Sequence, residues 1–305
     1  MKQGEEKELL SICIPTRNRV AFLTDLLDTI GRQILEDDLG EDVAVYVSDN
    51  ASDDGTQELC RRWQGRLPRF YYSRNIVNIG GDANILHVRT LGRGSYVWVY
   101  GDDDILHERA LVAVVNLLRE EAPGLLVAIH GKYGLPKPPA RCYDDFRSYA
   151  KTCIHANVHV LGEQSLITSN IHRSDCYDVE YARQRLDTHL AQMYGLVRSV
   201  YKLRAKVVIP DFPVISLSDK LIGSTEAWIN LDASWIAYFT WLQTELGLPE
   251  LDPLAPSRIA RRLMLRQILL NPFGYLWHHR KQLANPTAWR FAVRRLIGGH
   301  RSNCP

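Results

Sequence analysis

The sequence predicts an α/β fold in which helices cover both faces of a mostly parallel sheet. Short apolar, β-branched runs alternate with segments whose apolar residues recur at helical spacing. The strand-like runs are apolar at nearly every position, as in strands buried on both faces. This alternation is typical of consecutive strand–helix–strand units with parallel strands. The expected strands are residues 9–14, 43–47, 70–72, 96–100 and 125–129, and the expected helices are 20–34, 54–63, 82–91 and 107–119.

The composition is that of a globular chain. Of 305 residues, 46% are hydrophobic and 24% are charged, which excludes disorder, collagen and coiled coil as overall classes. The longest apolar runs are far shorter than the roughly 20 residues of a membrane-spanning helix. Residues 1–8 lack the basic start and apolar run of a signal peptide, and the six cysteines form no C-x-x-C pair. We therefore expect a cytoplasmic protein without a disulfide framework or a thiolate zinc site.

Charge is distributed unevenly along the chain. Residues 253–305 hold ten of the 37 Lys and Arg residues and no Asp or Glu, which leaves 27 basic against 35 acidic residues elsewhere. Apolar and aromatic side chains between the arginines predict short basic amphipathic helices, broken at Pro272 and Pro286. Such helices bind an anionic membrane surface; a helical cap on the main domain is the alternative. No recognition motif for nucleic acid accompanies the charge, so no nucleic-acid partner is expected.

Polar residues follow the predicted strands, at the edge where parallel sheets bind ligands. Pro15 is expected to end the first strand, and the polar residues after it open a helix whose N–H groups can face an anion. Asp49, at the end of the second strand, can accept hydrogen bonds from a nucleobase or a ribose; a plain turn with a helix cap is the alternative. In the loop at 75–82, Gly80 and Gly81 either let the backbone approach a ligand or turn the chain.

Three adjacent aspartates follow the strand at 96–100. Asp102, Asp103 and Asp104 repel one another, and burying their charge is costly without a cation. Mg²⁺ or Mn²⁺ suits such carboxylates, with phosphate oxygens and water completing the coordination. In an extended segment Asp102 and Asp104 point to one side as metal ligands, and Asp103 points to the other, toward a sugar or ribose. The alternative is a solvated acidic turn that caps a helix beginning near Leu106.

Taken together, four motifs resemble glycosyltransferase family 2, and within it the abequosyltransferase-like enzymes of bacterial polysaccharide assembly. The resemblance covers residues 9–220 and is strong over 9–120. It implies a GT-A fold, with a Rossmann-like sheet and a helical, basic C-terminal extension. The implied parts are a nucleotide-sugar-binding half at 1–130, an acceptor-binding half at 131–220 and a helical region at 221–305. The motifs are SICIPTRNR at 11–19, VSDNASDDGT at 47–56, NIGGDAN at 78–84 and GDDD at 101–104.

The resemblance also implies roles for single residues. Asp49 matches the carboxylate that reads the base, and Asp102 matches the carboxylate near the ribose and the metal. Asp104 matches the metal-binding end of the D-x-D motif, so Asp102 and Asp104 are the expected metal ligands. Ser169 and Asn170 lie in a segment that lines acceptor sites. The residues expected around the nucleotide sugar are Pro15, Thr16, Arg19, Asp49, Asp82, Asp102 and Asp103.

The general base is where the sequence departs from the family. The family inverts the anomeric centre in one displacement, using a carboxylate base from the second half of the domain, but no clear Glu-Asp pair stands at the expected place. The nearest candidates are Asp187 and His189, which open a helical run at 190–197. Asp187 is the preferred base, with a helix N-cap as its structural alternative. His189 is a base, an acceptor ligand or a core residue.

The predicted function is metal-dependent, inverting transfer of a sugar from a nucleoside diphosphate sugar to a hydroxyl of a glycan or a polyprenyl-diphosphate-linked glycan. Such transfer builds cell-surface polysaccharide, O-antigen included. The basic tail would hold the enzyme at the inner face of the cytoplasmic membrane. One alternative is a sugar nucleotidyltransferase, which is disfavoured because residues 15–19 form no Gly-rich phosphate loop. The other is a non-catalytic protein that binds nucleotide sugars or membranes.

Overall fold

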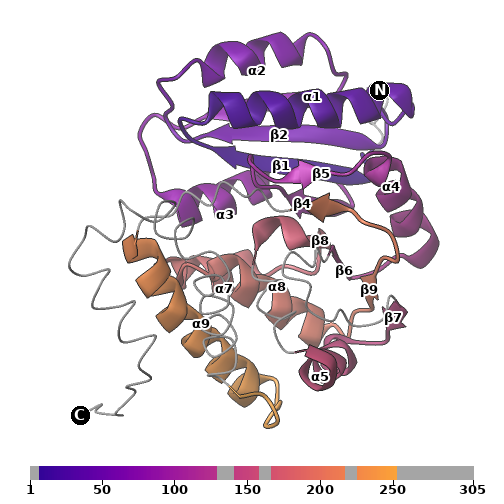
Figure 1. The fold of residues 1–305 in the computed structure, drawn as a ribbon, viewed down its shortest axis with the longest axis vertical. Coiled ribbons are helices and arrows are strands. Elements are labelled where there is room, and N and C mark those ends of the chain that lie inside the picture. Colours follow the sequence, from indigo (N-terminus) through magenta and orange to yellow (C-terminus); the bar gives the residue numbers. More distant parts are fainter. Residues whose placement is uncertain (1–6, 129–140, 158–165, 217–224, 253–305) are drawn as a thin grey trace, which may run out of the picture. The chain divides into compact units, whose positions relative to one another are not determined.

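The computed structural model describes residues 7–128, 141–157, 166–216 and 225–252 (Figure 1). The chain divides into two units, residues 1–220 and 221–305. In the second unit the structure describes one long helix, α9 (Thr225–Glu245), and the short segment that follows it. Among the described residues, no helix combines the length and the apolar character needed to cross a bilayer. The basic tail at 253–305, and the membrane contact predicted for it, lie outside the described residues.

The described part of the first unit is built on an eight-stranded sheet. Its strands are β1 (Leu10–Thr16), β2 (Val43–Asp49), β3 (Phe70–Arg74), β4 (Tyr96–Val99), β6 (Leu125–Val127), β7 (Arg141–Tyr143), β8 (Asn170–Arg173) and β9 (Val207–Ile209). Their order is β3-β2-β1-β4-β8-β6-β9-β7. Strands β1 to β4 are parallel, whereas β8 runs antiparallel to β4 and β6, and β7 runs antiparallel to β9. The mostly parallel sheet predicted from the sequence is therefore confirmed.

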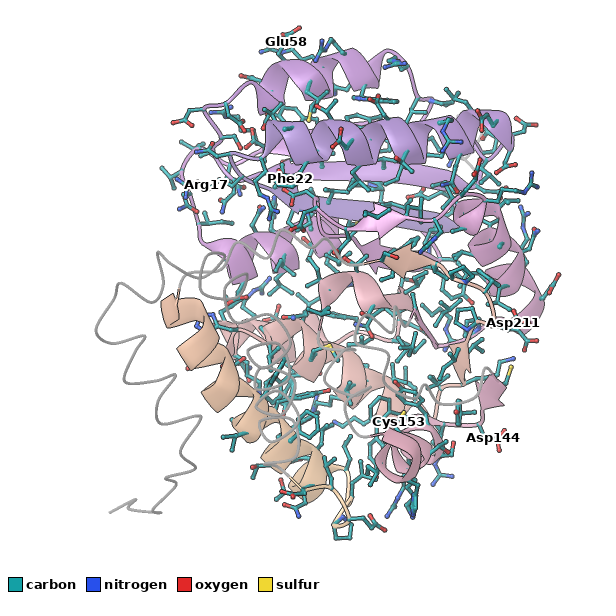
Figure 2. All side chains as sticks on the ribbon, viewed as in Figure 1. Arg17, Phe22, Glu58, Asp144, Cys153 and Asp211 are labelled. Atoms are coloured by element: carbon teal, nitrogen blue, oxygen red, sulfur yellow. The ribbon has the colours of Figure 1, made fainter. Side chains whose placement is uncertain are left out.

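Helices cover both faces of this sheet, as predicted (Figure 1). Alternate residues of β1 enter two different cores: Ile12 packs in the core that includes Leu27 of α1 (Val20–Glu36), and Cys13 packs with Val88 of α3 (Gly81–Leu91). Side chains fill the space between α1, α2 (Thr56–Gln64) and the sheet (Figure 2). The helices are α1 (Val20–Glu36), α2 (Thr56–Gln64), α3 (Gly81–Leu91), α4 (Ala110–Glu121), α5 (Phe146–Asn157), α7 (Val179–Arg183) and α8 (Ala191–Lys202), with 3₁₀ turns η1 (Ile167–Ser169) and η2 (Leu186–Thr188).

Strand β1 runs past Pro15, contrary to the prediction that Pro15 ends it. Pairing with β2 continues to the end of β1, and the carbonyl of Thr16 still accepts a 2.9 Å bond from Asn50 N–H. Pairing with β4 stops earlier, at Cys13, whose carbonyl accepts from Tyr100 N–H. Residues two apart point their backbone groups to the same side of a strand. The nitrogen of Pro15, which has no hydrogen, therefore faces the side on which the ladder has already ended.

The start of the fourth predicted helix is also corrected. Residues 105–106 form a short strand, β5 (Ile105–Leu106), which pairs antiparallel with β10 (Ile215–Ser216). Helix α4 begins only at Ala110, after Arg109 has adopted a left-handed backbone conformation with φ of 56°. The apolar pair at 105–106 fits both a helical stripe and a strand, and its partner lies more than 100 residues away in the sequence, where local periodicity gives no information.

Candidate active site

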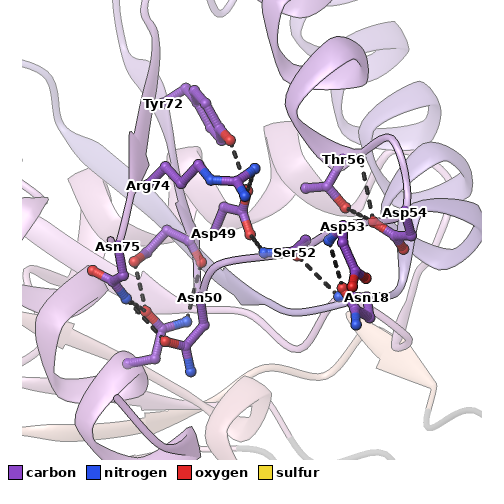
Figure 3. Close-up of polar contacts among 12 residues, drawn as sticks. Asn18, Asp49, Asn50, Ser52, Asp53, Asp54, Thr56, Tyr72, Arg74 and Asn75 are labelled. Atoms are coloured by element: carbon purple, nitrogen blue, oxygen red, sulfur yellow. Dashed lines mark hydrogen bonds and ion pairs between the residues drawn. The ribbon is translucent and has the colours of Figure 1, made fainter. Parts of the chain in front are cut away.

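The loops that follow β1 and β2 are hydrogen-bonded into one rim at the carboxyl edge of the sheet (Figure 3). The backbone N–H of Asn18 donates to Ser52 Oγ at 2.9 Å, and Asp53 N–H donates to Asn18 Oδ1 at 2.9 Å. Val20 N–H, in the first turn of α1, donates to Asp54 Oδ2 at 2.8 Å. Helix α1 is thus capped by a side chain from the next loop, and this fixes the two loops against each other.

Asp49, the expected base-reading carboxylate, lies at the centre of a closed polar cluster. It is fully buried, and its Oδ1 accepts a 2.7 Å bond from Ser52 N–H. Its Oδ2 accepts from Tyr72 Oη at 2.7 Å and pairs with Arg74 Nη1 at 3.3 Å (Figure 3). Burial and the bond to Asp49 raise the pKa of Tyr72, so Tyr72 stays protonated and donates. Arg74, whose side chain is 36% exposed, lies on the solvent side of this carboxylate.

The three aspartates at 102–104 lie in a turn rather than in an extended segment. Asp104 N–H donates to the Gly101 carbonyl at 3.3 Å. The Arg19 guanidinium pairs with Asp102 Oδ1 at 3.2 Å and with Asp103 Oδ2 at 2.6 Å. The expectation that Asp103 points away from Asp102 is therefore wrong, because a turn does not alternate side chains as a strand does. Arg19 also supplies a cation that offsets part of the acidic charge.

Asp102 and Asp104 are each held by a threonine from another part of the chain. Thr16 Oγ1 donates to Asp102 Oδ2 at 2.7 Å. Thr168 Oγ1 donates to Asp104 Oδ2 and accepts from Gly101 N–H at 2.9 Å. The backbone of Thr168 is fixed in turn, because its carbonyl accepts a 2.8 Å bond from Trp98 Nε1.

Thr168 is a residue of this site that the sequence patterns do not predict. Its neighbours Ser169 and Asn170, the residues expected to line the acceptor site, are both buried. Asn170 Nδ2 donates to the Leu166 carbonyl at 3.2 Å, and the side chain lines a cavity of about 20 Å³, enough for a water molecule. The hydroxyl of Thr168, next to two expected site residues, is the feature by which it could have been found. Its partner Asp104 could not be predicted, because it lies 64 residues away in the sequence.

The acidic turn fits a divalent cation that also binds phosphate. Burial raises the pKa of Asp102 to about 6 against the opposing effects of Arg19 and Thr16, so its charge is poorly solvated. The described residues contain no group of three or more His, Cys, Asp or Glu suited to a metal. Two carboxylates, Asp102 and Asp104, are what Mg²⁺ or Mn²⁺ takes from a protein when phosphate oxygens and waters supply the rest. The hydroxyl of Tyr100 is buried beside them, without a hydrogen-bond partner among the described residues.

The two candidate bases differ in their surroundings. His189 Nδ1 lies 3.2 Å from Asp82 Oδ2, so the structure joins a residue expected near the donor to a residue expected in catalysis. Asp187 is exposed in η2 and makes no hydrogen bond or ion pair with the described residues. The reading of Asp187 as an N-cap is wrong, because α8 begins at Ala191 with Leu190 as its cap residue.

The fold is GT-A, as in the following solved structures. Residues 1–349 of TarS from S. aureus match with a TM-score of 0.55 at 15% identity, over 95% of this chain and 80% of that chain. The same TarS fragment in complex with UDP-GlcNAc matches with a TM-score of 0.53 at 15% identity, over 94% and 81%. The mannosyltransferase PcManGT from Pyrobaculum calidifontis, in complex with GDP-Man and Mn²⁺, matches with a TM-score of 0.52 at 14% identity, over 95% and 85%.

Residues 11–160 match the family model described as Glycosyl transferase family 2. Among curated proteins the chain is similar to abequosyltransferase RfbV of Salmonella typhimurium (strain LT2), with 38% identity over 115 residues. The match covers 37% of this chain and 34% of the relative, so the chain spans about a third of that protein's length. The family resemblance predicted from the four motifs is confirmed.

Proposed function

We propose that the protein transfers a sugar from a nucleoside diphosphate sugar to a hydroxyl of a glycan or a lipid-linked glycan, in the synthesis of a polysaccharide. The observation that carries this proposal is the acidic turn. Asp102 and Asp104 stand at the carboxyl edge of a parallel sheet, where ligands bind, and Thr16 and Thr168 hold them in place. Similar folds in complex with UDP-GlcNAc and with GDP-Man and Mn²⁺ support the donor class.

The nucleoside is expected at the rim formed by the loops after β1 and β2. Arg74 covers Asp49 on the solvent side. A hydrogen-bond acceptor of the nucleobase therefore meets the Arg74 guanidinium, whereas a nucleobase N–H reaches Asp49 only when Arg74 moves aside. Pro15 and Thr16 form the wall beside the nucleotide, and Thr16 acts through Asp102. Gly80 has a positive φ of 90°, which glycine tolerates, and precedes the first turn of α3, in which Asp82 lies.

The diphosphate is expected between Arg19 and the acidic turn. The Arg19 side chain is 32% exposed and pairs with both Asp102 and Asp103, so its planar fork can exchange a carboxylate for a phosphate oxygen. Asp102 and Asp104 would hold Mg²⁺ or Mn²⁺, which when bound offsets the charge of the leaving diphosphate. Asp103, released by Arg19, is then available to a ribose or sugar hydroxyl.

The acceptor is expected on the side of η1, β8 and the start of α8. A base there removes the proton of the acceptor hydroxyl, and a single displacement inverts the anomeric centre. Asp187 and His189 are the candidates for the base, and Ser169 and Asn170 border the acceptor. The basic segment 253–305 would hold the protein at an anionic membrane surface, where a lipid-linked acceptor is found.

Release of nucleoside diphosphate tests this function. Wild type, Asp104→Ala and Asp211→Ala are assayed with Mn²⁺ and UDP-, GDP-, CDP- and dTDP-sugars; Asp211 is an exposed carboxylate in the loop after β9 (Figure 2). We expect Mn²⁺-dependent release with one donor class, lost on the order of 10²-fold in Asp104→Ala and retained in Asp211→Ala. The proposal fails if wild type releases no diphosphate from any donor, or if Asp104→Ala is as active as wild type. Release of pyrophosphate from a sugar phosphate and a nucleoside triphosphate would instead indicate a nucleotidyltransferase.

A further inference from the structure

Asp82 and His189 form a pair that joins the two halves of the domain. Asp82 lies in the first turn of α3, and His189 lies between η2 and α8. The His189 Nδ1 to Asp82 Oδ2 distance is 3.2 Å. The two residues are more than 100 positions apart in the sequence, so the pair exists only because α3 and the start of α8 meet in the fold.

The pair lies at the ligand-binding edge of the sheet. The residues on either side of Asp82 are tied to the end of β2: the Gly80 carbonyl accepts from Asn50 Nδ2 at 3.2 Å, and Asn84 Oδ1 accepts from Ser48 Oγ at 2.7 Å. Asp82 therefore shares this edge with Asp49, which ends β2. It is also partly open, because the Asp82 side chain is 21% exposed and the His189 side chain 47%.

Hydrogen-bond chemistry assigns the imidazole tautomer. An ionised carboxylate only accepts hydrogen bonds, so in a neutral ring Nδ1 carries the proton that points to Asp82. Nε2 then bears the lone pair and is the basic atom. The described residues offer Nε2 no hydrogen bond or ion pair, which leaves it open to a ligand hydroxyl. An imidazole oriented by a carboxylate is the arrangement by which many enzymes activate a hydroxyl.

We propose that His189 is the general base of the sugar transfer and that Asp82 is its positioning residue; this rests on the proposed function. His189 Nε2 takes the proton of the acceptor hydroxyl, and the acceptor oxygen bonds to the anomeric carbon. The bond from that carbon to the diphosphate oxygen breaks, and its electron pair leaves with the nucleoside diphosphate. The imidazolium that results is stabilised by the Asp82 carboxylate, and its proton passes to solvent after the product leaves.

His189 replaces Asp187 as the preferred base. Asp187 and His189 share one turn, but of the two only His189 has a partner among the described residues that fixes its orientation. Asp82, which was expected to contact the donor, instead orients the base in this proposal. The pKa of Asp82 lies above its usual value, because burial outweighs the interaction with His189, which lowers it.

Chemical rescue provides the sharpest test. His189 has a backbone φ of 56°, a conformation that glycine adopts readily, so His189→Gly removes the ring without backbone strain. We expect kcat to fall about 10²- to 10⁴-fold in this variant, as for the loss of a general base. Added imidazole should restore a large part of the lost activity in His189→Gly and leave the rate of wild type unchanged. Failure of imidazole to raise the rate would overturn the assignment.

Asp82→Asn tests the positioning role, with Glu58→Gln, at an exposed carboxylate in the first turn of α2, as the matched control. Asn still accepts a hydrogen bond but has no charge, so we expect kcat to fall about tenfold, with the KM for the donor unchanged. A rise in the donor KM with kcat retained would return Asp82 to the donor site and overturn its role here. A loss of kcat in Asp187→Asn as large as that in His189→Gly would make Asp187 the base.

Donor binding separates failure of this inference from failure of the proposed function. Binding of the active donor class with Mn²⁺, measured by calorimetry, should be the same in wild type, His189→Gly and Asp82→Asn. If wild type binds and turns over no donor, the proposed function fails. If the variants bind the donor normally but show neither rescue nor a loss of kcat, only the dyad is refuted.

Discussion

The hydroxyl of Thr16, at the end of β1, donates a 2.7 Å hydrogen bond to the carboxylate of Asp102, which follows β4. The two residues are 86 positions apart in the sequence, but β1 and β4 are neighbouring parallel strands. Their ends therefore share one edge of the sheet, and a loop from one reaches the loop from the other. The position of Asp102 is thus set by strand order, and not by the acidic turn alone.

Thr16→Val should weaken metal binding without affecting the fold. The variant keeps the shape of the side chain but removes the donor to Asp102, which costs on the order of 1–2 kcal/mol, or about tenfold in affinity. Titration of Mn²⁺ in the presence of the nucleoside diphosphate measures this loss. Thr29→Val, on the exposed face of α1, removes a comparable hydroxyl and should change nothing. Equal affinities in both variants would show that Thr16 does not position a metal ligand.

Asp102→Asn should stabilise the metal-free protein at neutral pH while removing its activity. Burial raises the pKa of Asp102 to about 6 in the folded state, against an ordinary value of 3.8. The folded state therefore binds this proton more tightly than the unfolded state does, and wild type loses stability as the pH rises from about 4 to about 6. The variant carries no such charge, so its advantage is on the order of 1–3 kcal/mol at pH 7.5.

Urea unfolding with a chelator present checks this prediction at two pH values. The advantage of Asp102→Asn over wild type should be full at pH 7.5 and should shrink at pH 4.5, where wild type is largely protonated. A variant that is less stable than wild type at pH 7.5, or an advantage independent of pH, would contradict the assigned environment of Asp102.

Gly195→Ala should destabilise the packing that supports the turn at 186–189. A Cβ at position 195 would lie 2.7 Å from the Asp178 carbonyl oxygen and 2.9 Å from Ala182 Cβ, so α8 could not stay as close to α7. Alanine gains up to about 1 kcal/mol in helix propensity, but overpacking against backbone costs about 1–3 kcal/mol. Thermal unfolding should show a lower Tm. Gly65→Ala, where the nearest neighbour is 3.8 Å away, is the control and should not lower the Tm.

Removal of residues 253–305 should abolish binding to anionic vesicles. This segment carries ten basic residues and no acidic ones, and each basic residue contributes about 1 kcal/mol near an anionic surface. Cosedimentation with vesicles containing phosphatidylglycerol, compared with neutral vesicles, measures the effect for the full chain and for residues 1–252. Unchanged binding after truncation would refute the membrane role of the tail.

Much of the nucleotide-binding half could be predicted from local sequence patterns. Strands β1, β2 and β4 are continuous apolar runs, and α1 carries an apolar stripe, so periodicity was enough to find them. Asp49 ends one such strand and Asp102 comes shortly after another, which places both at the ligand-binding edge without knowledge of the structure.

Side-chain partners could not be predicted in the same way. The pairing of Arg19 with two aspartates, the bond from Thr168 to Asp104 and the Asp82–His189 pair all join segments far apart in the sequence. The enclosure of Asp49 by Tyr72 and Arg74 depends on the register of β2 against β3. Only the order and register of the strands decide which of these polar side chains meet.

The most direct test of the acidic turn is anomalous diffraction from crystals grown with Mn²⁺ and the donor nucleoside diphosphate. We expect an anomalous peak at about 2.0–2.2 Å from carboxylate oxygens of Asp102 and Asp104, in contact with the diphosphate. A bound diphosphate whose Mn²⁺ lies elsewhere, with both carboxylates facing only solvent and Arg19, would contradict the metal site from which the proposed function is argued.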